Sequence, residues 1–290
     1  MVKKCLFALL WFTGVTRLVA YLNRHKVAII CYHSITESSN GDDVHKLHLP
    51  RRLFIQHLDH LSRNYRVISL NEFLAARRER RRLPNYSVVL IFDDGFEDFF
   101  TVATAELGRN RFPATVFVIT DYVSGNSPLS DYRPLSWNQV EQLAAQGFQV
   151  GSHTHSHPYL LDLPAVQMHK ELDYSRASLL KHVGQANVAL SYPYGQTSSA
   201  ISKLAETIGY SCGITGKLGL NSEATKTYEL YRTTIASDDD RFTFAARAAG
   251  LTWWVTELRQ LLGGKPEMDP QAKIEIDLVP PQCEAEEYSS

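Results

Sequence analysis

The feature that most constrains the fold is a regular alternation that begins near residue 26. Short apolar runs rich in β-branched residues alternate with segments whose apolar residues recur at helical spacing. This pattern is typical of strand–helix units around a mostly parallel sheet. The chain has 290 residues, 44% of them hydrophobic, which is enough to bury one sizeable core. No internal repeat or linker is visible, so the sequence predicts one main α/β domain.

The alternation can be followed along the whole domain. Strands are predicted at VAIICYH, YRVISL, SVVLIFDD, ATVFVIT, FQVGSH, NVALSYPYG, YSCGIT and ELYRTTI. Helices are predicted at LFIQHLDHLSRN, EFLAARRER, SWNQVEQLAAQG, about 164–183 and SAISKLAETIG. We expect Asn71 to cap the second of these helices and Ser136 the third.

The two ends of the chain differ from the domain between them. Residues 1–25 form an N-terminal segment, 26–262 the domain, and 263–290 an acidic, polar tail that we expect to be poorly ordered. The first segment has an apolar run of about a dozen residues, too short to span a bilayer. It resembles a secretory signal, but Arg17 interrupts it and no small-x-small cleavage site follows. We therefore favour a retained amphipathic helix, which either lies on a membrane surface or packs on the domain, over a cleaved signal. We also favour a cytoplasmic or membrane-associated protein over a secreted one.

Charge and cysteine content exclude several classes of protein. Lysine and arginine total 30 against 31 acidic residues, so no net basic face for nucleic acid is expected. The cysteines, at positions 5, 31, 212 and 283, show no spacing typical of a disulfide framework or a cysteine-rich zinc site. The basic run at 77–82 is better explained as a solvated helix end than as a polybasic contact with an anionic surface. Oligomeric state is left open.

Two adjacent carboxylates end the strand SVVLIF. Asp93 and Asp94 follow this apolar run directly, and Gly95 comes next. Two carboxylates held together raise each other's pKa and cost free energy unless a cation or a proton lies between them. A turn and helix cap would also explain the pair. At the carboxyl end of a parallel strand, however, the pair lies where sites are usually built.

A second cluster follows another predicted strand. The segment GSHTHSHP holds histidines at 153, 155 and 157, and Pro158 favours a loop over a helix. Imidazoles with a carboxylate are the ligands that suit zinc and related divalent metals. A metal bound by one carboxylate and two imidazoles would compensate the acid pair and leave a position open for water. The remaining carboxylate would then act as a base.

Together these motifs resemble a known family. VVLIFDDGF, GSHTHSHP and LSYPYG stand in the order and rough spacing of the polysaccharide deacetylase family, carbohydrate esterase family four, also called the NodB homology domain. CYHSI and the segment 53–74 resemble the N-terminal part of one branch of it, so the similarity covers about residues 26–235. The resemblance implies a distorted (β/α) barrel of about seven strands and a metal-dependent hydrolase.

The resemblance also implies roles for individual residues. Asp93 matches the general base, and the matched metal ligands are Asp94, His153 and His157. Tyr194 matches the position whose backbone N–H stabilises the oxyanion together with the metal. His155 occupies a variable place in the family pattern and receives no role. By itself, YPYG is fully explained as a turn beside a packed aromatic residue.

The sequence departs from the family pattern at two places. Ser191 stands where the family often has an arginine that orients the base, and the usual late histidine is missing because His182 is the last histidine. We expect His33 to supply the missing general acid, since it follows an apolar strand directly, as Asp93 does. A histidine satisfied by backbone groups is the ordinary explanation of His33, and His155 is the second candidate for the acid.

These observations predict a carbohydrate N-deacetylase that uses one divalent metal ion, zinc by preference. Its substrate would be an N-acetylated glycan or amino sugar, with metal-activated water attacking the amide carbonyl. The first alternative is a catalytically degenerate carbohydrate-binding member of the same fold. Phosphoryl transfer by an aspartate nucleophile is the weakest alternative, because it expects an acid where Gly95 stands.

Overall fold

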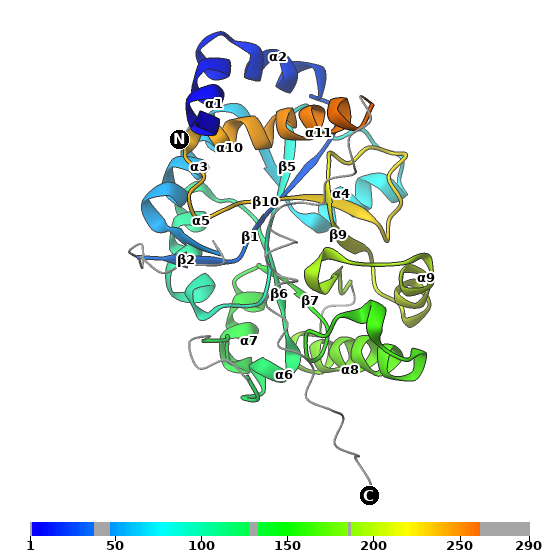
Figure 1. Ribbon diagram of the computed structural model, residues 1–290. Coiled ribbons are helices and arrows are strands. Elements are labelled where there is room, and N and C mark those ends of the chain that lie inside the picture. The colour runs from blue at the N-terminus through cyan, green and yellow to red at the C-terminus, as the bar shows by residue number, and fades with distance from the viewer. Residues whose placement is uncertain (1, 38–46, 128–132, 185–186, 262–290) are drawn as a thin grey trace, which may run out of the picture.

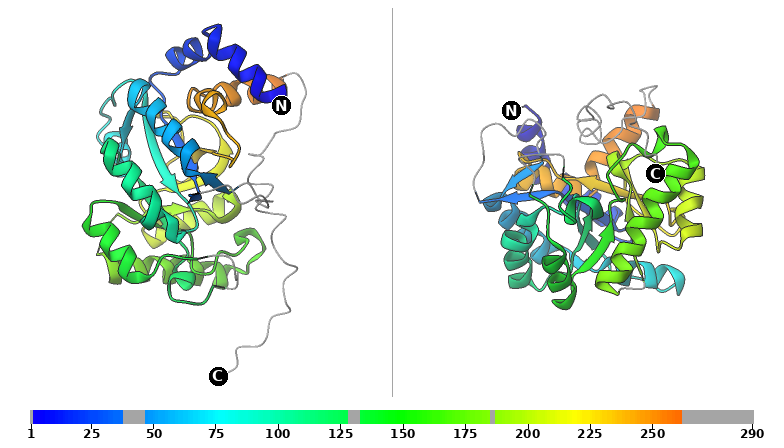
Figure 2. Two further views of the ribbon diagram at one scale, coloured as in Figure 1. Left: turned by 90° about the vertical axis from the view of Figure 1, so that its left-hand side faces the viewer. Right: turned by 90° about the horizontal axis from the view of Figure 1, so that it is seen from below.

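A computed structural model describes residues 2–37, 47–127, 133–184 and 187–261 of the chain. The tail predicted at 263–290 lies outside the described residues. The two views of Figure 2, with Figure 1, show helices arranged around a central group of strands.

Seven parallel strands close into a barrel. Their order around the ring is β1 (Ala28–Tyr32), β10 (Leu230–Thr234), β9 (Gly213–Leu218), β8 (Leu190–Ser191), β7 (Gln149–Ser152), β6 (Thr115–Val118) and β5 (Ser87–Phe92). The ring closes because β1 pairs with β5 over five residue pairs, Ala28–Val88 to Tyr32–Phe92. The predicted barrel of about seven strands is confirmed.

Within the described residues, three further strands lie outside the ring. β4 (Arg66–Ile68) pairs with the first half of β5, and β6 pairs with the second half. β2 (Ser34–Thr36) and β3 (His48–Pro50) form a separate parallel pair just after β1.

Helices follow most of the strands. In chain order they are α3 (Arg51–Asn64), α4 (Leu70–Arg78), α5 (Thr104–Asn110), α6 (Thr120–Val123), α7 (Trp137–Ala145), α8 (Ala165–Val183), α9 (Ser199–Ile208), α10 (Arg241–Ala248) and α11 (Leu251–Leu261). A π-helical turn, η1 (Phe99–Ala103), precedes α5, and two short 3₁₀ turns are η2 (Leu160–Asp162) and η3 (Pro193–Gly195). Ser136 caps α7 as predicted. The cap predicted at Asn71 is wrong, because α4 already begins at Leu70 and Ser69 accepts a hydrogen bond from the Glu72 N–H.

The strands are apolar on both faces because each face has its own core. One set of alternate residues, such as Ile30, Leu90 and Phe92, packs with the surrounding helices. The other set, which includes Ile29 and Val89, packs with buried residues of other strands in a second cluster that also extends to β4 and α4. Side chains alternate between the faces of a strand, so this second set faces the barrel interior.

The N-terminal segment forms two helices, α1 (Val2–Phe12) and α2 (Val15–Leu22). They pack against α10 and α11 (Figure 1), and Trp11 and Phe12 both contact the Phe242 ring. Among the described helices none alone is long and apolar enough to cross a membrane, although α1 from Lys4 and α2 together would be, with a bend of 77° between them.

Candidate active site

The acid pair adopts its shape through two left-handed residues. Asp93 continues β5, and its N–H donates to the Tyr32 carbonyl. Asp94 then has φ 68° and Gly95 φ 71°. A Cβ on Gly95 would lie 2.9 Å from a methyl of Val118, so glycine is needed for space as well as for φ. This turn sends the two adjacent carboxylates into different surroundings.

The histidine loop after β7 is also held in an unusual conformation. Thr154 has φ 67° and His157 φ 61°. Glu171, on α8, accepts hydrogen bonds from the N–H groups of His155 and Ser156, at 3.0 and 2.8 Å, and from the Ser156 hydroxyl at 2.7 Å. The His157 N–H donates to the Thr154 hydroxyl at 3.1 Å. Left-handed residues other than glycine cost free energy, so this loop is held by its hydrogen bonds.

Asp94, His153 and His157 come together as a candidate metal site. Their ligand atoms lie within 4.8 Å of one another. Asp94 Oδ1 is 3.2 Å from His153 Nε2 and 3.7 Å from His157 Nε2. The Asp94 and His157 side chains are each 15% exposed, so the group is open on one side.

The hydrogen bonds of His153 favour a cation in this group. Its Nδ1 donates to the Ser191 carbonyl at 2.7 Å, since a carbonyl can only accept. If the ring is neutral, its Nε2 therefore carries a lone pair that faces the Asp94 carboxylate. Both Nε2 and the carboxylate are then hydrogen-bond acceptors, so a proton or a metal ion between them is needed to hold them together. Burial lowers the pKa of His153, but Asp93 and Asp94 outweigh burial and raise it. The donors thus fit a divalent metal held by one carboxylate and two imidazoles.

Asp93 is fully buried beside this group and bonded on one side only. Its Oδ2 accepts from the Ser191 hydroxyl at 2.9 Å and from the guanidinium of Arg232. Its Oδ1 is buried and has no hydrogen-bond partner. Burial raises the pKa of Asp93, but the positive charges of Arg232 and His153 outweigh burial and lower it. Asp93 is therefore an ionised carboxylate with one oxygen available for a proton.

Arg232 was not predicted from the sequence. It lies on β10, is 1% exposed, and also donates to the Ser191 hydroxyl at 3.2 Å. In the family pattern, an arginine at the position of Ser191 orients the base. Here Arg232, from another strand, contacts that same carboxylate of Asp93. The one signal in the sequence was a charged residue within the otherwise uncharged strand LYRTT, but nothing there identified its partner.

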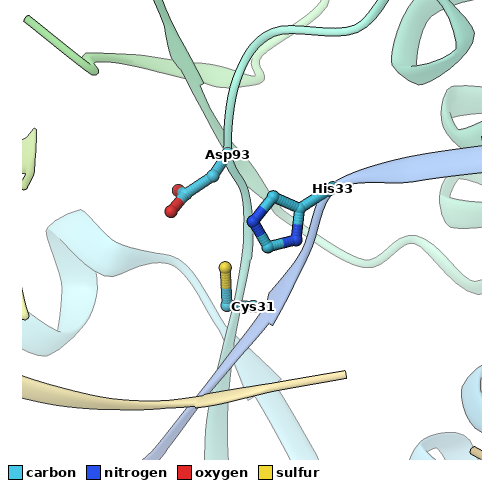
Figure 3. A group of neighbouring side chains, drawn as sticks. All are labelled: Cys31, His33 and Asp93. Carbon is cyan, nitrogen blue, oxygen red and sulfur yellow. The ribbon is translucent and has the colours of Figure 1, made fainter. Parts of the chain in front are cut away.

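The structure places His33 beside Asp93 and His155 away from it. His33 is 2% exposed, and a ring nitrogen lies within 4.8 Å of an Asp93 oxygen. Figure 3 shows the ring next to that carboxylate at the end of β1. The charge of His33 contributes to the low pKa of both aspartates. His155 instead places Nδ1 3.0 Å from the Thr120 hydroxyl, with its ring near Tyr174.

Tyr194 lies over the histidine loop. Its ring meets the His157 ring at 4.7 Å, edge to face, and its hydroxyl donates to the His157 carbonyl at 3.4 Å. Its backbone is left-handed, with φ 56°. Of the seven described residues other than glycine with positive φ, four belong to this site: Asp94, Thr154, His157 and Tyr194. Such clustering is typical of functional sites.

Comparison with known proteins points to one family. Residues 80–213 match the family model described as polysaccharide deacetylase. Over this part of the chain the protein is similar to the polysaccharide deacetylase family. The resemblance and the predicted class of enzyme, a carbohydrate N-deacetylase, are confirmed. His33 and Arg232 both lie outside the matched residues.

Individual relatives agree with this similarity. The chain is 26% identical to YxkH of Bacillus subtilis over 212 residues, which are 73% of this chain and 72% of that protein. It is 26% identical to the poly-β-1,6-N-acetyl-D-glucosamine N-deacetylase of Staphylococcus epidermidis over 182 residues, 60% of this chain and 62% of that relative. The structure of the Streptococcus pyogenes deacetylase PplD in complex with acetate has a TM-score of 0.70 and 25% identity, and the match covers 77% of this chain and 98% of PplD.

Proposed function

We propose that this protein removes N-acetyl groups from amino sugars of a glycan or glycan precursor, with one divalent metal, zinc by preference, held by Asp94, His153 and His157. The observation that carries the proposal is the buried carboxylate of Asp93 beside this group: its Oδ2 lies 3.9 Å from His153 Nε2, and its Oδ1 has no hydrogen-bond partner. The acetate bound to PplD and the substrate in the name of the staphylococcal relative support it.

Each residue then has one task. When bound, the metal lowers the pKa of water and polarises the amide carbonyl. Asp93 accepts the proton that the attacking water loses, because its Oδ1 is ionised and unpartnered. The backbone N–H of Tyr194 stabilises the oxyanion of the tetrahedral intermediate. His33 donates a proton to the amide nitrogen as the C–N bond breaks, which releases acetate and a free amine.

The alternative is a binding protein that has lost catalysis. Ser191 and the missing late histidine motivate this alternative. Two contacts argue against this alternative. Arg232 contacts Asp93, as the family's arginine at the position of Ser191 would, and His33 lies beside Asp93, where it can replace the missing late histidine. A protein that only binds sugar would gain nothing from an ionised, buried carboxylate with an unpartnered oxygen.

Acetate release decides between the two. Purified protein would be incubated with a panel of N-acetylated glycans and amino sugars, before and after metal removal. Asp93→Asn should keep the metal and lose about 10²–10⁴-fold in turnover, because an amide cannot accept the proton. Asp94→Asn should lose the metal itself. No acetate from any substrate with the metal bound, or equal metal loss in both variants, would contradict the proposal.

We also propose that the protein lies on an anionic membrane surface through α1 and α2. Exposed fractions of 50–73% are unusual for large apolar side chains, and six occur here: Leu6, Leu9, Phe12, Leu18, Tyr21 and Leu22. The exposed Arg80, Arg81 and Arg82 lie nearby, since the Tyr86 N–H donates to the Arg24 carbonyl just after α2. Apolar and basic groups together are complementary to anionic lipid.

Vesicle sedimentation tests this orientation. The full chain should bind phosphatidylglycerol vesicles and bind phosphatidylcholine vesicles less, and Leu9→Glu/Leu18→Glu should abolish binding. Concentration-dependent self-association that the same substitutions remove, without vesicle binding, would show that a second copy covers this face instead.

A further inference from the structure

A third side chain shares the space between the proposed base and acid. On β1 the inward-facing residues Ile29 and Cys31 alternate along the strand, and His33 continues the alternation just after its end. In the same way Asp93 follows Val89 and Ile91 of β5. Because β1 and β5 pair Cys31 with Ile91, the thiol lies one layer below His33 and Asp93. Figure 3 shows the Cys31 sulfur below and between the imidazole and the carboxylate.

These three side chains have the composition and spacing of a metal site. Their ligand atoms, one sulfur, one ring nitrogen and one carboxylate oxygen, lie within 4.8 Å of one another, and all three residues are buried. Zinc bonds to these ligand types at about 2.0–2.3 Å, so tetrahedral ligands around it are separated by roughly 3.5 Å. Movements of about 1 Å would close the group on an ion. A thiolate ligand selects zinc, cadmium and other soft metals over magnesium or calcium.

Asp93 provides independent evidence for a ligand here. Its Oδ2 is held by Ser191 and Arg232, whereas its Oδ1 is buried without a hydrogen-bond partner. A buried carboxylate oxygen without a partner is costly, and a bound cation would remove that cost. Arg232 can keep its contact with Oδ2 while Oδ1 binds a metal.

We propose that Cys31, His33 and Asp93 form a second, inhibitory site for a soft divalent metal. Binding releases the thiol proton to solvent and forms bonds from the metal to sulfur, nitrogen and oxygen. The guanidinium of Arg232 repels a cation, so this site fills after the Asp94–His153–His157 group. The inhibition rests on the proposed function, because the metal would occupy both the proposed base and the proposed acid. The binding of the metal does not depend on that function.

The test uses the full chain with Cys5 and Cys283 replaced by serine, which removes the exposed thiol and the one outside the described residues. Protein holding one equivalent of zinc is titrated with cadmium and, separately, with more zinc. We expect a second equivalent to bind, a cadmium–thiolate absorption band to appear in the ultraviolet, and acetate release to stop in parallel.

Two cysteine variants localise the effect. Cys31→Ala should lose the absorption band and raise the inhibitory zinc concentration by about tenfold or more, with activity in one equivalent of zinc retained. Cys212→Ala removes another thiol buried in the same interior core and should respond like the parent. The proposal is wrong if the parent binds no second equivalent, or if the band and the inhibition persist in Cys31→Ala. If the protein shows no deacetylase activity but its absorption band still depends on Cys31, the metal site is supported and only the proposed function is refuted.

Discussion

At the scale of single residues, the two members of the acid pair have different neighbours and therefore different proposed roles. Asp94 turns toward two imidazoles, and Asp93 is held by a hydroxyl and a guanidinium. The sequence predicts the pair and the histidines, since each follows a strand. It could not predict Arg232, because the residue is 139 positions from Asp93 and meets it only when the barrel closes.

Arg232 is expected to position Asp93. Arg232→Gln should retain the metal and the KM but reduce kcat by about 10–100-fold, as loss of a group that orients a metal-site residue does. The double variant Ser191→Arg/Arg232→Ser should recover part of the kcat, because both positions contact the same carboxylate. Metal analysis, kinetics and thermal unfolding would be measured for each. Wild-type kcat in folded Arg232→Gln would refute the role.

Asp98 carries a local stability cost at neutral pH. Burial raises its pKa to about 6, although the Ser34 hydroxyl donates to it. Since this value lies above that of an unfolded aspartate, the folded state binds the proton more tightly. The stabilisation is complete below about pH 4 and is lost as pH rises through 6.

Asp98→Asn, which mimics the protonated form, should therefore be more stable than the wild type at pH 7.5 by about 1–2 kcal/mol, after allowance for partial exposure. The difference should shrink toward pH 4. Urea unfolding at both pH values measures it, with the exposed Asp59→Asn on α3 as control. A difference that does not change with pH would refute this assignment.

At the scale of elements, local sequence predicts most helices and strands and fails where neighbouring elements decide. β4 ends at Ile68, so Ser69 is already free to cap α4, and Asn71 falls within its first turn. β8 has only two residues, because the chain leaves the sheet for the turn Pro193–Gly195 just after Tyr192, whose N–H still donates to the Ile214 carbonyl. The left-handed residues of the histidine loop could not be predicted, because they depend on Glu171 of the next helix.

The loop between β7 and α8 is therefore expected to depend on Glu171. Glu171→Gln replaces one of the two acceptor oxygens with a donor and loosens His155 and Ser156, so His157 should be held less firmly. We expect metal affinity to fall by about 10–100-fold with the fold intact. Metal competition with a chelating dye measures the change, and Glu141→Gln on α7, which removes only an exposed pair with His182, is the control. Equal affinities of Glu171→Gln and the control would show that the loop holds its shape without this carboxylate.

At the scale of the whole molecule, closure of the barrel joins the two ends of the domain. β1 pairs with both β5 and β10, which brings His33, Asp93 and Arg232 to one mouth. Alternating strands and helices predict a parallel sheet, but they do not say which strands close it. That closure depends on non-local packing, and His57 of α3 contributes to this packing through its contact with Tyr32 at the end of β1.

His57 links three parts of the closed barrel. Its Nε2 donates to the Asp239 carbonyl at 2.9 Å, its Nδ1 lies 3.4 Å from the Tyr32 hydroxyl, and its ring stacks on Phe244 at 4.1 Å. The residue is fully buried, and burial lowers its pKa to about 3. An unfolded histidine titrates near 6.5, so between these values the unfolded state binds more protons. Stability contributed by neutral His57 is thus present above pH 6.5 and is lost as pH falls toward 3.

Between pH 8 and pH 5, protonation of His57 in the unfolded state should lower the unfolding free energy of the wild type by about 2 kcal/mol. Glutamine offers a donor and an acceptor but does not titrate, so in His57→Gln the fall over this range should be smaller by that amount, whatever the absolute stability of the variant. Urea unfolding at pH 8, 6 and 5 measures both slopes. His169→Gln, an exposed change on α8, should keep the wild-type slope. Glutamine cannot take up a proton in this pH range. If His57→Gln nevertheless keeps the wild-type slope, the loss of stability in acid arises from groups other than His57.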